Sequence, residues 1–467
     1  MNRSFKLFLL ILTLCAALCA ALCVTALAAD YEAAAQELSA IGMFRGTGTG
    51  FELDRKPTRA EAAIMLVRLY GAEERAQADY AAGLIAHPFV DVPGYAAPHV
   101  AWLYSNGLTK GMSANTFGSA QDCTAQSYAT FLLRALGWQD GMDFAYADAL
   151  TAAAQVGFYQ AELFPGDFLR DDLAALTYQA LAADTKAGDN WLLAQLIESG
   201  AVDAAAAQPM TEKMELYRAL MQAGDPADLD ALDMDLTLDY SILYTANGGS
   251  LESKASTETK LAYRGEGEDF QAAYLTTVTA DDTALSTDLW VKDGWQYMAM
   301  DMEMLGMTLK VKYPMTQEEM AELQTSGESH TVVLSELAMV KSITAEKQGL
   351  DTVYTLVLDG NNEALSVLAG ESFAENVPEG AVLNSMTFAD MEMVCTVDKE
   401  GVATSQVMTF LCKADLTTLA ADGSRQPLTM VLDYTLDQTI NAYGSKVRVS
   451  FPDLSEFQEI DPSLLEE

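Results

Sequence analysis

Hydrophobic residues follow two different periods along this chain. Up to about residue 223 they recur at helical spacing, as in the stripe formed by Ala60, Ile64 and Val67. From Leu232 onward they alternate with polar residues, which is the pattern of half-buried antiparallel strands. The sequence therefore predicts a multidomain α + β protein, with an all-α N-terminal part and an antiparallel β-rich C-terminal part.

The C-terminal part carries the signals of a long antiparallel sheet. Its first strand begins at Leu232, and Asp293 with Gly294 marks a hairpin. Two short helices are expected among the strands, one opening at Thr316 and the other over 361–368. Further strands are predicted at 255–279, 284–291, 298–304, 306–313, 336–346, 352–358, 384–397, 402–414, 427–437 and 445–451.

The helical part contains an internal repeat. A glycine-containing loop leads into a helix that begins at Thr58–Glu61, and Gly111–Phe117 leads into a second helix that begins at Thr124. A fainter third copy leads into Arg170–Asp172. One unit is too short to bury its apolar stripe alone, so the three copies should pack together as a triplicated helix-loop-helix module.

These signals also give the domain boundaries. Residues 30–86, 87–140 and 141–202 are expected to form the three repeats, of which the third is degenerate. Residues 203–230 are expected to form a linker that contains a helix, and residues 231–467 the β-sheet domain.

Residues 1–29 have the layout of a secretory signal peptide. Arg3 and Lys6 precede an apolar run, and small residues lie just before Asp30. Two alternatives remain open: the run is almost long enough for an uncleaved membrane anchor, or one of its cysteines carries a lipid. A cleaved signal predicts a protein that is secreted and held at the cell wall or cell surface.

The net charge narrows the choice of partners. The chain carries 27 Lys and Arg against 67 Asp and Glu, a formal net charge of −40, so we expect no binding to nucleic acid. Residues 30–203 contain 10 basic and 22 acidic side chains, whereas residues 204–467 contain 15 and 45. Attachment to an anionic polymer must therefore depend on local positive groups rather than on bulk attraction.

The sequence lacks the signals of catalysis and of metal binding. Cys123, Cys395 and Cys412 are the cysteines that remain after cleavage, and their spacing indicates neither a disulfide framework nor a zinc site. The three histidines have no metal-ligand spacing, and no nucleophile elbow or phosphate-binding loop occurs. We therefore expect a non-catalytic protein without metal or cofactor.

Two groups of residues in the helical part resemble the S-layer homology (SLH) module, a triplicated cell-wall anchor of bacterial surface proteins. The resemblance covers residues 30–202 and implies three helical units around a pseudo-threefold axis. It also implies grooves between neighbouring units that bind a secondary cell-wall polysaccharide, which often carries ketal-linked pyruvate. The residues that carry it are the helix start Thr58–Glu61, and Phe89, Asp91, Val92, Trp102, Gly107 and Gly111.

Side-chain chemistry within such a groove names the candidate binding residues. Arg59 offers a planar guanidinium for a carboxylate, Trp102 a flat face for a sugar ring, and Lys110 a second positive charge. Gly107 and Gly111 let backbone N–H groups approach the ligand. Each side chain also has a purely structural interpretation, as part of the core, a helix cap or a salt bridge.

The second and third repeats depart from the motif. The second helix start, Thr124–Ser127, lacks both Arg and Glu, and the third keeps Arg170 but follows it with Asp171–Asp172. Arg170 is retained as a binding residue, whereas Glu61 and Asp91 are expected to cap helices or to position donors. The groove between repeats one and two is therefore expected to be the best equipped.

The β-rich part is rich in methionine, with 17 of the 22 residues after position 203. Methionine fills irregular apolar spaces and can line a site for a lipid or another apolar ligand. Long strands alternating with two helices resemble the curved half-barrels of bacterial lipid-binding lipoproteins. We predict a non-catalytic surface protein that displays its β domain; the alternative is a wall-tethered carrier whose β domain binds an apolar ligand.

Overall fold

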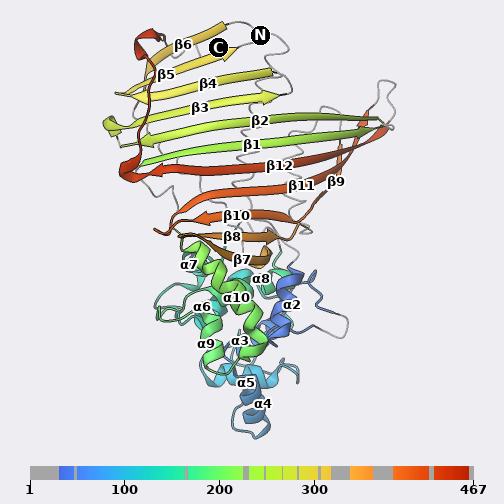
Figure 1. Ribbon diagram of the computed structural model, residues 1–467. Helices are drawn as coiled ribbons and strands as arrows, with labels where there is room; N and C mark the ends of the chain where they lie inside the picture. The colour runs from blue at the N-terminus through green and yellow to red at the C-terminus, as the bar shows by residue number, and fades with distance from the viewer. Residues whose placement is uncertain are drawn as a thin grey trace.

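The computed structural model shows an α + β protein with its helices in the N-terminal half and its sheet in the C-terminal half (Figure 1). The predicted signal peptide, and the helices predicted after Thr316 and over 361–368, lie outside the described residues. Within the described part, no helix is both long and apolar enough to cross a membrane. The structure describes residues 31–46, 50–161, 164, 167–223, 231–246, 249–265, 267–280, 283–302, 307–316, 337–360, 382–419 and 425–461.

The helices of the N-terminal half begin and end where local sequence requires it. The predicted capping box forms at α3, where the Thr58 hydroxyl accepts from the Glu61 N–H and the Glu61 carboxylate accepts from the Thr58 N–H. The helices are α2 (Glu32–Ala40), α3 (Arg59–Leu69), α4 (Glu73–Ala81), α5 (Ala97–Ser105), α6 (Ala125–Ala135), α7 (Ala149–Val156), α8 (Arg170–Ala182), α9 (Leu192–Glu198) and α10 (Ala204–Met221).

Two hydrophobic clusters hold these helices together. The larger one joins α2, α6, α8 and α9 around fully buried residues such as Tyr128 and Tyr178. The smaller one joins α3, α4 and α5 around Leu66, Val100 and Leu103. Because α3 contributes side chains to both clusters, it connects α4 and α5 to the helices of the larger cluster.

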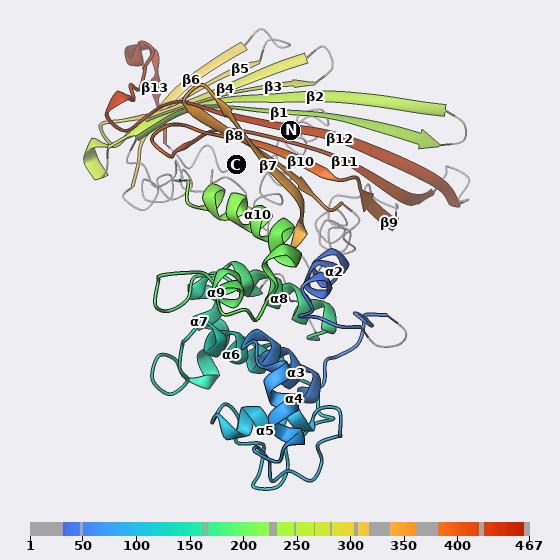
Figure 2. The same ribbon diagram turned by 60° about the horizontal axis from the view of Figure 1, so that its bottom comes forward.

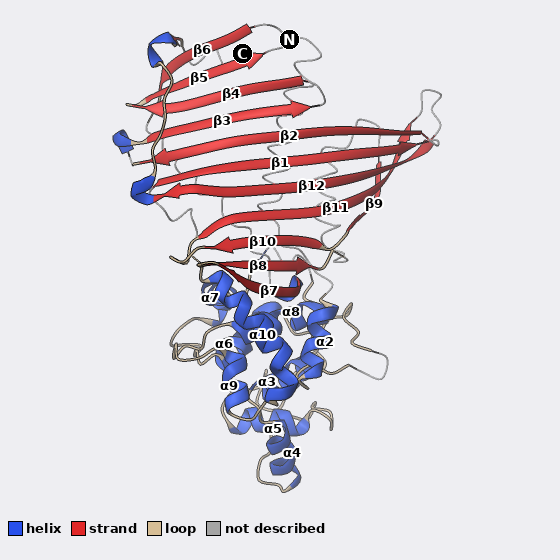
Figure 3. Cartoon of the chain, viewed as in Figure 1, coloured by secondary structure: helices blue, strands red, loops and turns tan. Residues whose placement is uncertain are grey.

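The C-terminal half is one sheet of thirteen strands, drawn in red in Figure 3. The spatial order is β13-β6-β5-β4-β3-β2-β1-β12-β11-β10-β8-β7, with β9 paired to β11, and only β13 runs parallel to its neighbour. The strands are β1 (Ala231–Ala246), β2 (Gly249–Arg264), β3 (Gln271–Ala280), β4 (Thr283–Lys292), β5 (Trp295–Met302), β6 (Met307–Pro314), β7 (Val340–Gln348), β8 (Asp351–Leu358), β9 (Val382–Phe388), β10 (Met391–Val397), β11 (Ala403–Leu419), β12 (Arg425–Tyr443) and β13 (Gln458–Glu459).

One face of the sheet is apolar over most of its width. In the centre, Leu238 of β1 lies opposite Leu436 of β12, and further along β11 and β10 Met408 lies opposite Met393. Helix α10 covers the β7 end of this face, where its Leu220 packs into a cluster of residues from β7, β8 and β10. Figure 2 shows the sheet arching over α10, so the apolar face is the concave one.

Three of the predicted strands differ from those observed. The segment 255–279 is divided between β2 and β3 because Gly265 and Gly267 adopt left-handed backbone angles and turn the chain. The segment 384–397 is likewise divided, between β9 and β10. The segment 445–451 forms no strand; its apolar residues, including Phe451, pack against Trp290 and Tyr297 on the sheet. The cysteines Cys395 and Cys412 are unbridged, in line with their spacing, and both are buried.

A buried charged group joins the helices to the sheet. The Lys213 ammonium on α10 donates to the Glu37 carboxylate (2.6 Å) and to the Val340 carbonyl of β7 (3.0 Å). The Tyr178 hydroxyl donates to the same carboxylate at 2.5 Å, and the ammonium lies 4.8 Å from the Tyr178 ring centre. Burial lowers the pKa of Lys213 and raises that of Tyr178. Elements from both halves therefore meet at one ammonium group.

Replacing Lys213 with Met should weaken this junction. The variant loses two charge-assisted hydrogen bonds, so we expect the free energy of unfolding to fall by about 2 kcal/mol and the β7 amides to exchange faster. Lys341→Met is the matched control, because Lys341 lies on β7 and its partners Asp359 and Asp390 are partly exposed, so its loss should cost less than about 1 kcal/mol. Equal effects in both variants, measured by urea unfolding and hydrogen exchange, would contradict this role for Lys213.

Candidate functional site

A groove of about 690 Å³ opens between the start of α3, the loop that follows α5, and helix α6 with the loop after it. We call it the Arg59 groove. Of the candidate residues, it brings together Arg59, Gly107, Lys110 and Gly111. Residues that lie about 50 positions apart in the chain therefore line one cavity.

Two hydrogen bonds and a ring contact hold Arg59 in place, but its guanidinium has no carboxylate partner among the described residues. Its backbone N–H donates to the Gln121 carbonyl at 2.8 Å, and its Nε donates to the Phe117 carbonyl at 3.3 Å. The guanidinium also lies over the Phe117 ring, 5.2 Å from the centroid. Within the described residues, neither Arg59 nor the exposed Lys110 forms an ion pair, so the groove keeps uncompensated positive charge.

Asp91 fixes the loop that forms one wall. Its carboxylate accepts from the backbone N–H groups of Phe117 and Gly118 at 2.7 Å and of Ser119 at 3.1 Å. Burial alone would raise the pKa of Asp91, but these three donors outweigh it and hold the pKa below its ordinary value. Asp91 thus fixes the backbone of residues 117–119, because their N–H groups donate to its carboxylate.

Trp102 does not line the groove. Its ring packs against Tyr70, with the centroids 5.6 Å apart, and Tyr70 is the aromatic residue that lines the groove at this point. Burial raises the pKa of the Tyr70 hydroxyl, although the nearby Arg134 opposes the shift. The indole expected in the groove is therefore a packing partner of Tyr70, which lines it.

Three groove residues were missed by sequence reasoning. Arg134, at the end of α6, donates to the Leu108 carbonyl at 2.9 Å and pairs with Asp140 at 2.8 Å. Trp138 and Tyr146 come from the loop after α6. In the sequence, Arg134 lies in the last turn of an amphipathic helix and Trp138 just after it, and no motif marks either residue as a binding residue.

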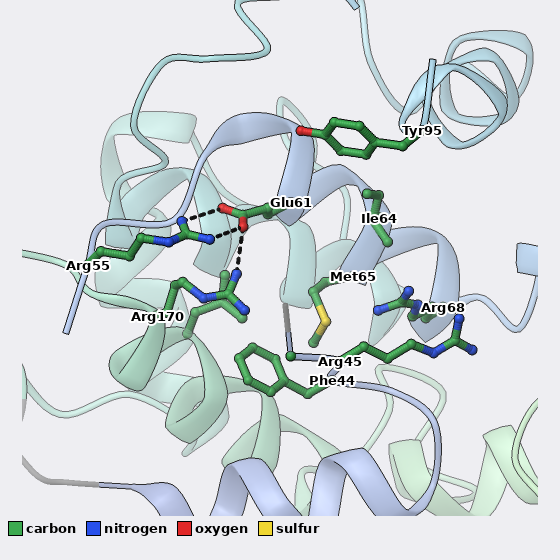
Figure 4. Close-up of a pocket in the computed structure, with 11 residues that line it drawn as sticks. Phe44, Arg45, Arg55, Glu61, Ile64, Met65, Arg68, Tyr95 and Arg170 are labelled. Atoms are coloured by element: carbon green, nitrogen blue, oxygen red, sulfur yellow. Dashed lines mark hydrogen bonds and ion pairs between the residues drawn. The ribbon is translucent and has the colours of Figure 1, made fainter. Parts of the chain in front are cut away.

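Arg170 lies in a different cavity, of about 430 Å³, shown in Figure 4. It is 3% exposed, and its guanidinium donates to the Glu61 carboxylate at 2.8 Å. Arg55 approaches the same carboxylate with both terminal nitrogens, at 2.6 and 3.0 Å. The structure therefore corrects the grouping of Arg170 with Arg59: Arg170 is buried in an ion pair and does not reach the Arg59 groove.

The two cavities differ in whether their cationic side chains form ion pairs with carboxylates. Around the Arg170 cavity, Glu73 pairs with both Arg45 and Arg68, while Glu61 pairs with Arg55 and Arg170. Each of these arginines thus has a carboxylate partner. In the Arg59 groove Arg134 pairs with Asp140, whereas Arg59 and Lys110 have no such partner among the described residues. The described residues contain no group of three or more His, Cys, Asp or Glu side chains that could hold a metal ion.

Residues 88–122 match the model of the S-layer homology domain. This stretch runs from the segment before α5 to the loop before α6 and includes Asp91, Trp102, Gly107, Lys110 and Gly111. A domain of this family indicates association with the cell surface and a polymer of the cell wall as partner. No curated protein matches the sequence.

Three solved structures show distant similarity to this chain. They are a DUF1329 family protein from Desulfovibrio piger (9% identity, TM-score 0.14), the ywiB protein from Bacillus subtilis (6%, 0.13) and a putative outer membrane lipoprotein-sorting protein domain from Vibrio parahaemolyticus (10%, 0.14). The matches cover 49%, 45% and 55% of this chain and 93%, 94% and 99% of the other chains. At these scores they support no argument about function.

Gly111→Ala should damage the groove wall more than Gly107→Ala. Both glycines have left-handed backbone angles (φ +70° and +72°), which cost about 1–2 kcal/mol for alanine. An added Cβ at Gly111 would also lie 2.3 Å from the buried ring of Phe89, whereas nothing lies within 4 Å at Gly107. Thermal unfolding of the two variants should show the larger loss for Gly111→Ala, and equal losses would rule out this steric constraint.

Proposed function

Because this chain is an SLH-domain-containing protein, we propose that it is an exported, non-catalytic cell-surface protein attached to the wall by a secondary cell-wall polysaccharide. The polysaccharide binds in the Arg59 groove, and the β-sheet domain is displayed outward. Residues 1–29 serve as the signal peptide in this proposal, and no cofactor or metal takes part.

The observation that carries the proposal is the unpaired positive charge of the Arg59 groove. The chain has a formal net charge of −40, yet Arg59, Lys110 and Arg134 line this groove against one carboxylate, Asp140, which pairs with Arg134. A guanidinium beside an ammonium suits a carboxylate-bearing sugar, and ketal-linked pyruvate supplies such a carboxylate. The Gly107–Gly111 loop lines the same groove, although the N–H groups of Gly107 and Gly111 already donate to the Tyr104 carbonyl and the Thr109 hydroxyl.

We further propose that residues 30–86, 87–140 and 141–202 are three copies of one unit. A repeated contact supports this division: Arg59 donates from Nε to the Phe117 carbonyl, and Arg170 donates from Nε to the Phe51 carbonyl. The two arginines open α3 and α8, and each phenylalanine belongs to the loop of a neighbouring unit. Residues 203–230 then link the module to a β domain over residues 231–467.

Arg59→Gln should weaken binding to polysaccharide purified from the cell wall. Glutamine keeps a donor but removes the charge, so we expect the dissociation constant to rise about tenfold to a hundredfold. Gln126→Ala is the control, because Gln126 lies in the first turn of α6 and bonds to the Tyr146 carbonyl (2.6 Å) without lining the groove; the position of α6 that corresponds to Arg59 is already Ala125. Unchanged binding in both variants, measured by calorimetry, would refute the assignment of this groove.

The second candidate function is a wall-tethered carrier of a lipid or other apolar ligand. The observation that favours it is the concave apolar face of the sheet, to which Met298 and Met300 of β5 and Leu309 of β6 belong. In this alternative the helical module tethers the chain, and the sheet does the binding.

Native mass spectrometry of the chain from residue 30 to 467 separates the two functions. A displayed, non-carrier domain should give the mass of the polypeptide alone. A retained lipid that survives buffer exchange and is released only on denaturation would favour the carrier. The comparison with the denatured mass of the same preparation controls for covalent modification.

A further inference from the structure

The Arg59 groove follows the length of α6. Ser127, in the first turn of the helix, and Arg134, in the last, both line it, and their seven-residue separation corresponds to about 10 Å along the axis. Arg59 lies at the first end, because its backbone N–H bonds to Gln121 just before α6. Trp138 lies at the other end, where its backbone N–H donates to the Leu133 carbonyl at 2.9 Å. The groove is therefore longer than a single sugar ring needs.

The exposed part of Trp138 is hydrocarbon. The side chain is half-buried and lines the groove, but its Nε1 atom is buried and has no hydrogen-bond partner among the residues described. The ring surface left open to the groove is thus carbon, the kind of surface on which the C–H face of a sugar packs. The Lys186 ammonium lies 5.6 Å from the ring centre and fixes the indole from the third repeat.

Ion pairs hold this end of the groove in place and remove its charge. Arg134 pairs with Asp140, and Lys186 pairs with Asp143 at 2.6 Å, so two points of the loop after α6 are held by ion pairs. The cation nearest to Trp138 within the groove, Arg134, is therefore neutralised, unlike Arg59 at the opposite end. One end of the groove suits an anionic group, and the other suits an uncharged sugar face.

We propose that the Arg59 groove binds two consecutive sugar units, an acidic one at Arg59 and Lys110 and an uncharged one against Trp138. This proposal rests on the proposed function, since it assumes that the groove binds wall polysaccharide. It adds a specificity: the protein distinguishes a disaccharide of the right order from an isolated acidic sugar.

The test uses wall polysaccharide hydrolysed and separated by size into single acidic sugars, acidic disaccharides and longer fragments. Wild-type protein should bind the disaccharide about tenfold more tightly than the single sugar, with little further gain in longer fragments. Trp138→Ala should lose this gain and keep its affinity for the single acidic sugar, and Trp138→Phe should restore part of it. Trp102→Phe, which alters an indole outside the groove lining, should behave as wild type.

The possible outcomes distinguish failure of the Trp138 site from failure of the proposed wall-binding function. If Trp138→Ala keeps the full gain from the second sugar while Arg59→Gln abolishes binding, the Trp138 site is refuted and the wall-binding function stands. If the wild-type protein binds neither the polysaccharide nor any fragment, the function fails and the Trp138 site with it. Fluorescence on adding disaccharide gives a second readout: the change seen in wild type should vanish in Trp138→Phe, and its persistence there would overturn the proposal.

Discussion

The Glu61 carboxylate is the interaction on which the helical half depends. It caps α3 through the Thr58 N–H, accepts two hydrogen bonds from Arg55, and pairs with Arg170 at the start of α8. Burial alone would raise the pKa of Glu61, but the hydrogen bonds from Arg55 and Thr58 outweigh it and keep the pKa below its ordinary value. One ionised group therefore begins one helix and joins it to another that lies more than a hundred residues further along the chain.

Helix geometry explains how the same turn also serves the groove. Residues two apart on an α-helix point about 200° from each other, so Arg59 and Glu61 must leave the first turn of α3 on different sides. Glu61 faces the cavity in Figure 4, where it forms ion pairs with Arg55 and Arg170. Arg59 faces the other side, where the described residues offer its guanidinium a carbonyl and an aromatic ring but no carboxylate. The Arg59 charge is therefore unpaired among the described residues, whereas the Arg170 charge is paired with Glu61.

Local features of the sequence could be predicted, and features set by distant packing could not. The Thr58–Glu61 cap depends on a few neighbouring residues, and the sequence predicts it. Whether Arg170 would be exposed depended on Glu61, which is 109 positions away and not marked by any pattern. Trp102 was expected in the groove and Trp138 was not, because nothing local in the sequence shows that Trp102 packs against Tyr70 while Trp138 lines the groove. In the sheet, alternation placed the strands, whereas glycines in left-handed conformations set their ends.

The junction at Lys213 constrains how the β-sheet half can move. A domain on a flexible linker would sample many orientations relative to its anchor. Here α10 continues from the helical half and packs beneath the sheet, and the residues just before β7, Leu337–Met339, belong to the helical core cluster. A force on the sheet is therefore transmitted to the helices through buried contacts. Because Glu37 lies on α2 and Tyr178 on α8, separating the halves requires breaking the contacts of both helices with this junction.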